Sequence, residues 1–67
     1  MEDFKVRLVE ELKELNDRKH DLFDFTQTDK FKELEERMQL HMLHQLNAME
    51  LYSFHLAERM AILGIEF

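Results

Sequence analysis

The residues best suited to binding lie in the second half of the chain, in a row with heptad spacing. Gln45, Tyr52 and Arg59 follow one another in steps of seven, and His41 precedes them by one helical turn. A row at this spacing normally faces a partner helix. An arginine near an aromatic ring also suits a nucleotide, because the guanidinium can hold a phosphate while the ring stacks on a base. The row is therefore either a nucleotide-binding surface or a polar seam that fixes the register between subunits.

Histidines in the same half raise the question of a metal site. His41 and His44 lie three residues apart on one helical face, and His55 follows three turns further along. Imidazoles at this spacing can share a metal ion. Carboxylate di-metal bundles, however, need a Glu-x-x-His pair from each of two helices, and the nearest approach, Asp17-x-x-His20, occurs once. We therefore expect solvent-facing or interface histidines and no bound metal.

Composition and motifs disfavour several classes of function. The chain has no cysteine, Ser-His-Asp order, phosphate-binding loop or nucleophile elbow, so we expect no enzyme activity and no cofactor. A formal net charge of -6 repels phosphates and disfavours direct binding of DNA or RNA. No stretch reaches the roughly 18 apolar residues of a membrane span. The acidic N-terminus is unlike a secretory signal, and we expect a cytoplasmic protein.

The first element is predicted to be a helix from about residue 3 to about residue 24. An apolar stripe with helical periodicity runs along it and consists of Phe4, Leu8, Val9, Leu12, Leu15, Leu22 and Phe23. The opposite face is acidic and carries Glu10, Glu14, Asp17 and Asp21. Lys19 interrupts the apolar stripe, and we expect its aliphatic stem to cover the core while its amine reaches outward.

Residues 25–28 are predicted to form a tight turn into a second helix, unbroken from about residue 29 to about residue 63. This segment holds no proline and consists of strong helix formers, and Gly64 is placed to end it in the left-handed conformation. Thr28 is placed to cap its first turn. An alternative use of Thr26, Thr28 and Lys30 is an anion site at the helix N-terminus. The predicted fold is one all-α domain, residues 1–67, folded as an antiparallel helical hairpin.

The second helix carries two apolar faces, and this pattern predicts self-association. One face should pack on the first helix and holds Phe31, Leu34, Met38, Met42, Leu46, Met49, Leu56, Met60 and Leu63. The far face is the predicted oligomer interface and holds Leu40, Leu43, Leu51, Phe54, Ala61 and Ile65. Because the first helix is shorter, residues 53–67 should extend beyond it and dock on another subunit. The expected assembly is a homo-oligomeric helical bundle, with a dimeric four-helix unit as its simplest form.

Three segments of the chain together match a known pattern. They are Asp3 to Leu15, Leu22 to Thr26, and Gln45-Leu46-x-x-Met49-x-x-Tyr52-x-x-x-Leu56-x-x-Arg59, with Arg7, Gln45, Met49, Tyr52 and Arg59 as the most specific positions. These segments resemble a family of very short phage proteins related to a crAss-like phage protein. His41 and His44 stand where family members often have acidic residues or lysine. The resemblance implies a phage or prophage origin and a helical-hairpin fold, and it implies no known reaction.

Small phage proteins without enzyme motifs are frequently counter-defence factors, and we expect that role here by analogy of size, helicity and expected self-assembly. The predicted function is sequestration of a small nucleotide-like immune signal, a cyclic nucleotide or an ADP-ribose derivative, in pockets between subunits. The expected ligand-binding residues are Arg7, Gln45, Tyr52 and Arg59. One alternative is an inhibitor whose acidic first helix occupies the basic groove of a host defence or nucleic-acid-binding protein. A second alternative is a small structural assembly module that binds no ligand.

Overall fold

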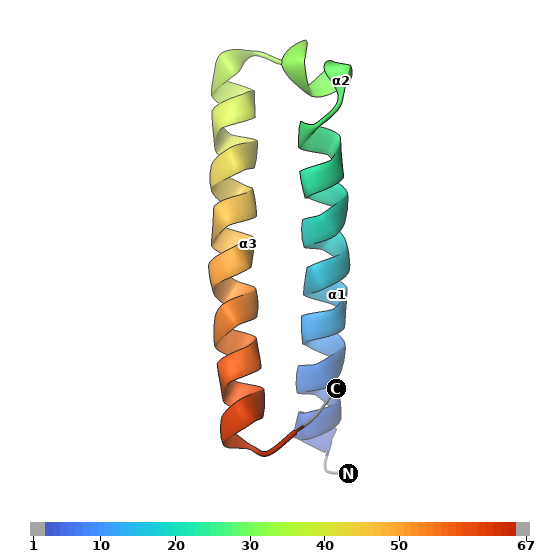
Figure 1. Ribbon diagram of the computed structural model, residues 1–67, viewed down its shortest axis with the longest axis vertical. Coiled ribbons are helices and arrows are strands. Elements are labelled where there is room, and N and C mark those ends of the chain that lie inside the picture. Colours follow the sequence, from blue (N-terminus) through green and yellow to red (C-terminus); the bar gives the residue numbers. More distant parts are fainter. Residues whose placement is uncertain (1–2, 66–67) are drawn as a thin grey trace.

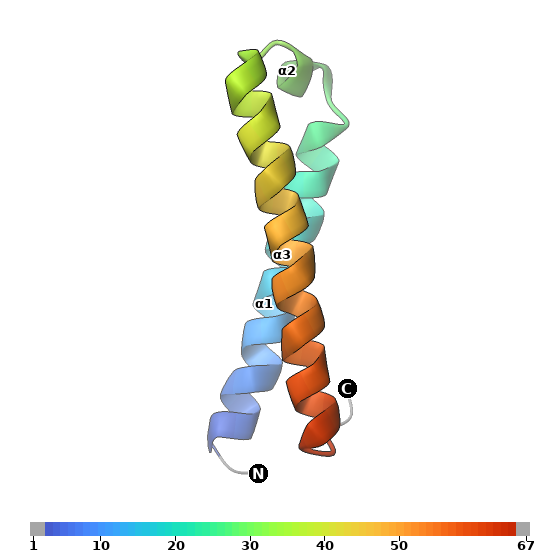
Figure 2. The ribbon, with the colours of Figure 1, turned by 90° about the vertical axis from the view of Figure 1, so that its left-hand side faces the viewer.

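Two long antiparallel helices form the molecule, and a short helix joins them at one end (Figure 1). The computed structural model describes residues 3–65, and these form α1 (Asp3–Thr26), α2 (Asp29–Lys32) and α3 (Glu36–Ile62). Seen from the side, α1 and α3 cross at a shallow angle, with α2 at the joined end (Figure 2). The rod measures 46 × 15 × 14 Å. The all-α hairpin is therefore confirmed for the described residues, among which no strand occurs.

The hydroxyls of Thr26 and Thr28 shape the end of α1 and the start of α2. Thr26 Oγ1 donates to the carbonyl of Phe23 at 2.6 Å, and Thr28 Oγ1 donates to the carbonyl of Phe25 at 2.7 Å. Thr28 Oγ1 also accepts from the backbone N–H of Phe31 at 3.3 Å, which makes Thr28 the N-cap of α2. The capping role of Thr28 is thus confirmed. Both hydroxyls serve the backbone, so the alternative anion site at this end has no support.

The prediction of an unbroken helix from residue 29 to residue 63 is wrong, because the chain turns a corner at residues 33–35. At this corner the chain packs one aromatic side chain and satisfies two backbone carbonyls, and these contacts offset the break in the helix. Phe31 is buried on α2 and meets the ring of Phe25 edge to face, with centroids 6.2 Å apart. Gln39 then satisfies carbonyls that the corner exposes: its Nε2 donates to the carbonyl of Leu34 at 2.7 Å and to that of Lys32 at 3.2 Å.

The corner also removes the predicted overhang of residues 53–67. Residues 29–35 are used to cross the end of α1, so α3 starts beside the end of α1 and finishes beside its beginning (Figure 1). Leu56 and Met60 are each only 1% exposed, and they form the core with Leu8, Leu12 and Leu15. The described part of the predicted overhang is therefore largely paired with α1, and Phe67 lies outside the described residues.

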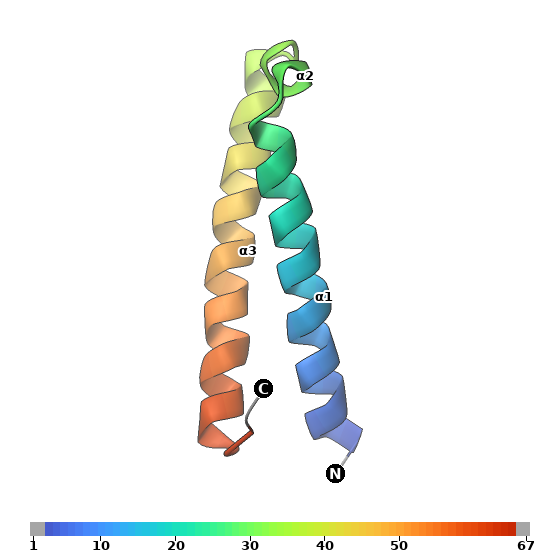
Figure 3. The same ribbon diagram turned by 45° about the vertical axis from the view of Figure 1, so that its right-hand side comes forward.

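Gly64 ends α3 as predicted and returns the chain to the core. It has a φ of 71°, in the left-handed region where glycine carries no steric penalty. The N–H of Ile65 donates to the carbonyl of Met60 at 2.9 Å, which closes the last turn. After this turn the chain points back toward α1 (Figure 3). Ile65 packs against the core, so its assignment to the outer interface is wrong.

Candidate functional site

The predicted ligand-binding residues lie in the open on the surface of the hairpin. Gln45, Tyr52 and Arg59 are exposed on α3, and Arg7 is exposed on α1. Leu8 and Met60 share the core cluster, so their chain neighbours Arg7 and Arg59 lie at the same end of the molecule. Among residues 3–65, neither arginine is paired with a carboxylate.

The spacing of this row decides what a single chain can do with it. Gln45 and Arg59 lie on one continuous helix and stand about 21 Å apart along its axis at about 1.5 Å per residue. A small ligand cannot bridge that length and touch both side chains of one copy. One chain therefore presents the predicted binding residues as a line rather than as the wall of a pocket.

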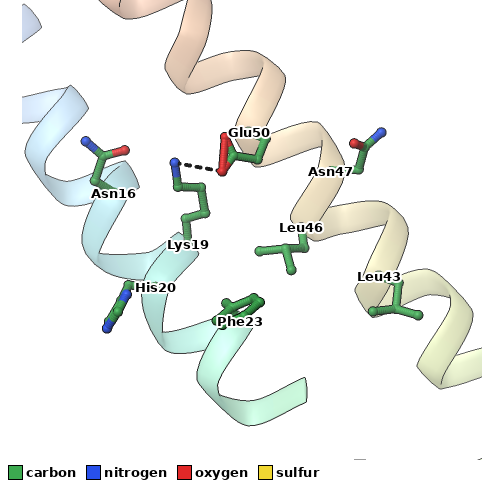
Figure 4. Close-up of a pocket in the computed structure, with 8 residues that line it drawn as sticks. All are labelled: Asn16, Lys19, His20, Phe23, Leu43, Leu46, Asn47 and Glu50. Atoms are coloured by element: carbon green, nitrogen blue, oxygen red, sulfur yellow. Dashed lines mark ion pairs between the residues drawn. The ribbon is translucent and has the colours of Figure 1, made fainter. Parts of the chain in front are cut away.

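A hollow of about 680 Å³ lies between α1 and α3, away from that row (Figure 4). Its walls combine amides, charged groups and apolar side chains, namely Asn16, Lys19, His20, Phe23, Leu43, Leu46, Asn47 and Glu50. Lys19 and Phe23 point toward α3, and Leu46 and Glu50 point toward α1 (Figure 4). Phe23 remains half exposed, so its ring is open to contact from outside the chain.

Lys19 is the charged group at the centre of this hollow, and α3 supplies its polar partners. Its Nζ lies 3.2 Å from Oε1 of Glu50 and donates to Oγ of Ser53 at 3.3 Å. The Lys19 side chain is 21% exposed, whereas that of Glu50 is 63% exposed. The aliphatic stem thus covers the core as expected, but the amine is held by the neighbouring helix. The sequence flagged Lys19 as an interruption of the stripe and gave no sign of partners more than 30 residues away.

The histidines do not assemble with other ligand types in the described chain. Among residues 3–65, no three His, Asp or Glu side chains stand close enough to hold a metal ion. His20 Nε2 lies 3.4 Å from Oδ2 of Asp24, a contact that becomes an ion pair only when the imidazole is protonated. The ring of His55 meets that of Phe54 edge to face, with centroids 5.3 Å apart. His41 and His44 are exposed on α3.

The predicted interface residues form a band on the side of α3 that faces away from α1. Leu40, Leu43, Leu51 and Phe54 are each about half exposed, and Ala61 is exposed as well. A shallow second depression, lined by Leu40, Leu43, His44 and Asn47, lies on the same band. In residues 3–65, no helix is apolar enough over a sufficient length to span a membrane. The band is an apolar surface that no other part of residues 3–65 covers.

Fold and surface together define a small all-α hairpin with a mixed polar and apolar hollow on one flank, a polar row on α3 and an uncovered apolar band. The model of the Sequestin family matches residues 2–62, which is nearly the whole chain, and the chain belongs to this family. No curated protein and no solved structure matches the chain. The specific relation to a crAss-like phage protein stays a prediction.

Proposed function

We propose that this protein sequesters a small nucleotide-like immune signal in pockets between its subunits, as a phage counter-defence factor. The observation that carries the proposal is membership of the Sequestin family over residues 2–62, because the family name denotes sequestration of a ligand. The ligand class and the pockets are our inference from the side chains described above, and the phage context follows from the resemblance noted in the sequence.

The exposed row on α3 supplies groups that a nucleotide needs. Arg59, with Arg7 at the same end of the hairpin, offers guanidinium groups for phosphate oxygens. Tyr52 has a half-exposed ring on which a base can stack. Gln45 carries an amide that can both donate to and accept from the edge of a base. Cyclic nucleotides and ADP-ribose derivatives combine phosphates with a base and so match these groups.

The proposal requires self-association, because the row of binding residues on one chain does not form a pocket. Gln45 and Arg59 of one copy lie too far apart to meet around one small ligand. A second copy docked beside this row would bring its own side chains to the ligand. Enclosure would also exclude water and strengthen the charge-assisted hydrogen bonds to phosphate.

Isothermal titration calorimetry of the purified protein tests this function. Cyclic dinucleotides, cyclic trinucleotides and ADP-ribose derivatives are titrated separately, and we expect saturable heat from at least one of them. Arg59→Ala and Tyr52→Ala should each weaken that ligand about tenfold or more. The matched control is Arg18→Ala, which removes an exposed arginine of α1 whose partner is Glu14 at 3.7 Å. Absence of heat from all three ligand classes would refute the proposal.

A second candidate function is inhibition of a basic host protein by α1. Glu10, Glu14, Asp17 and Asp21 are all exposed there, so the acidic face is open to a partner. A salt-sensitive complex with a nuclease or defence effector, lost when these four residues are replaced by lysine, would favour this function. A purely structural assembly module would give neither ligand heat nor such a complex.

A further inference from the structure

The uncovered band on α3 contains a stripe of five residues with symmetric spacing. This outer stripe consists of Leu40, Leu43, Asn47, Leu51 and Phe54. Asn47 is its centre, with leucines four residues away on both sides and a large apolar residue seven residues away on both sides. Steps of three and four keep all five on one side of a helix. All five are exposed in the single chain.

We propose that a second copy of the chain packs antiparallel against this outer stripe, with a two-fold axis passing beside Asn47. Reversing the stripe about Asn47 places leucine opposite leucine and Leu40 opposite Phe54, so the surface is complementary to itself. A two-fold interface has this property, because residue i of one copy meets residue j of the other and the reverse also holds. The inference deepens the proposed function by specifying which faces of two subunits meet.

The charges at the ends of the stripe fit an antiparallel pair. Arg37 lies ten residues before Asn47, and Glu58 lies eleven residues after it. In the proposed register each Arg37 therefore stands beside Glu58 of the other copy. Glu36 lies at the same level, and one guanidinium has enough donors to serve both carboxylates. A parallel pair would instead bring Arg37 next to Arg37 and Glu58 next to Glu58, which is repulsive.

The proposed interface is continuous with the hollow between α1 and α3. Leu43 and Asn47 belong to the outer stripe and also line the hollow (Figure 4). In the antiparallel register, Leu51 of the second copy meets Leu43, and the second Asn47 meets the first. The second copy thus contributes residues to the rim of the hollow.

The absence of cysteine from the native chain allows a clean test by engineered disulfides. A Leu40→Cys variant and a Phe54→Cys variant are mixed and oxidised. We expect a covalent dimer in which the cysteine at position 40 of one chain bonds to the cysteine at position 54 of the other. Each variant alone should give little dimer, because like positions are then far apart for a disulfide, whose Cα atoms lie within about 7 Å. Asn47→Cys alone should dimerise, and Asp17→Cys on the exposed face of α1 serves as the control.

The native assembly is measured in parallel by sedimentation and light scattering. Leu43→Glu combined with Phe54→Glu should lower the mass of the assembly without loss of helical circular dichroism, because both residues are exposed in the single chain. Val6→Glu, which charges an exposed apolar residue of α1, should leave the mass unchanged.

Three outcomes overturn the register: a single-copy mass at all concentrations up to about 100 µM, dimers formed mainly by Leu40→Cys alone, or an unchanged mass in the glutamate variant. Ligand heat is measured separately. If the register is wrong but a nucleotide gives heat, the proposed function stands. If the dimer is correct but no nucleotide gives heat, the proposed function is refuted and the register stands.

Discussion

Leu56 and Leu51 lie on the same helix, five residues apart, in opposite surroundings. Leu56 is 1% exposed in the core of the hairpin, and Leu51 is 60% exposed on the outer stripe. The residue type is the same, so composition does not separate the two sides of α3. What separates them is the partner: α1 covers one side, and the single chain has no further element among residues 3–65 to cover the other. This uncovered apolar side is the feature on which the proposed self-association rests.

The largest expected effect comes from truncating one leucine on each side. Leu56→Ala should lower the free energy of unfolding by about 2–5 kcal/mol, because it leaves a cavity among Leu8, Leu12 and Met60. Leu51→Ala, the same chemical change on the outer stripe, should cost less than about 0.5 kcal/mol in dilute protein. Urea unfolding followed by circular dichroism measures both. Equal losses of stability in the two variants at low protein concentration would contradict the assignment of Leu56 to the core and of Leu51 to the outer stripe.

The next effect compares two isoleucines at the end of α3. Ile65→Ala should lower the free energy of unfolding by about 1–2 kcal/mol, because Ile65 packs against the core. Ile62 is 82% exposed, so Ile62→Ala is the matched control and should change little. Thermal unfolding of both variants gives the comparison. A greater loss from the Ile62 variant in a dilute single chain would show that the chain does not fold back at Gly64.

A similar but smaller effect is expected at the corner that precedes α3. Gln39→Ala removes the donor to the carbonyls of Leu34 and Lys32 and should cost about 1 kcal/mol. Gln45→Ala removes an exposed amide from the middle of α3 and serves as the control. Amide hydrogen exchange should show faster exchange near residues 33–39 in the first variant alone. Identical exchange in the two variants would mean that the corner does not depend on Gln39.

The smallest effect is expected at the hollow. Lys19→Met keeps a long apolar stem over the core and removes the ion pair with Glu50, so stability should change by less than about 1 kcal/mol. The dependence of stability on salt should become weaker, because a partly screened pair is lost. Arg18→Met, which removes the more exposed pair with Glu14, is the control. Urea unfolding at two salt concentrations measures the change, and a loss of several kcal/mol would mean that Lys19 carries more of the fold than its partners indicate.

The sequence was sufficient for the parts of the fold that depend on local periodicity. The apolar stripe predicted α1 to within two residues of its observed end, and Thr28 and Gly64 predicted the two caps. The corner at residues 33–35 was missed because it depends on the packing of Phe31 against Phe25. Strong helix formers surround the break, and propensity gives way to such a tertiary contact. The error in the position of Ile65 has another cause: helical periodicity was continued past Gly64, where the chain folds back onto the core.

The candidate site could be predicted from the sequence less well than the fold. Exposed residues such as Tyr52 and Arg59 could be grouped by heptad spacing along one helix. The hollow, in contrast, is made by residues of two helices, and periodicity within one helix cannot show which turns of α1 and α3 lie opposite each other. The one available signal was Lys19, a charged residue within an apolar stripe. Its partners became evident only from the antiparallel pairing.

The contacts of Lys19 also distinguish the two apolar sides of α3. Both sides of α3 are apolar, so burial alone would allow either side to meet α1. The side that meets α1 carries Ser53 and Glu50, and these give the partly buried ammonium group two oxygen partners. The side of α3 that packs on α1 is thus also the side that holds the acceptors for Lys19, whereas the leucines of the outer stripe stay exposed.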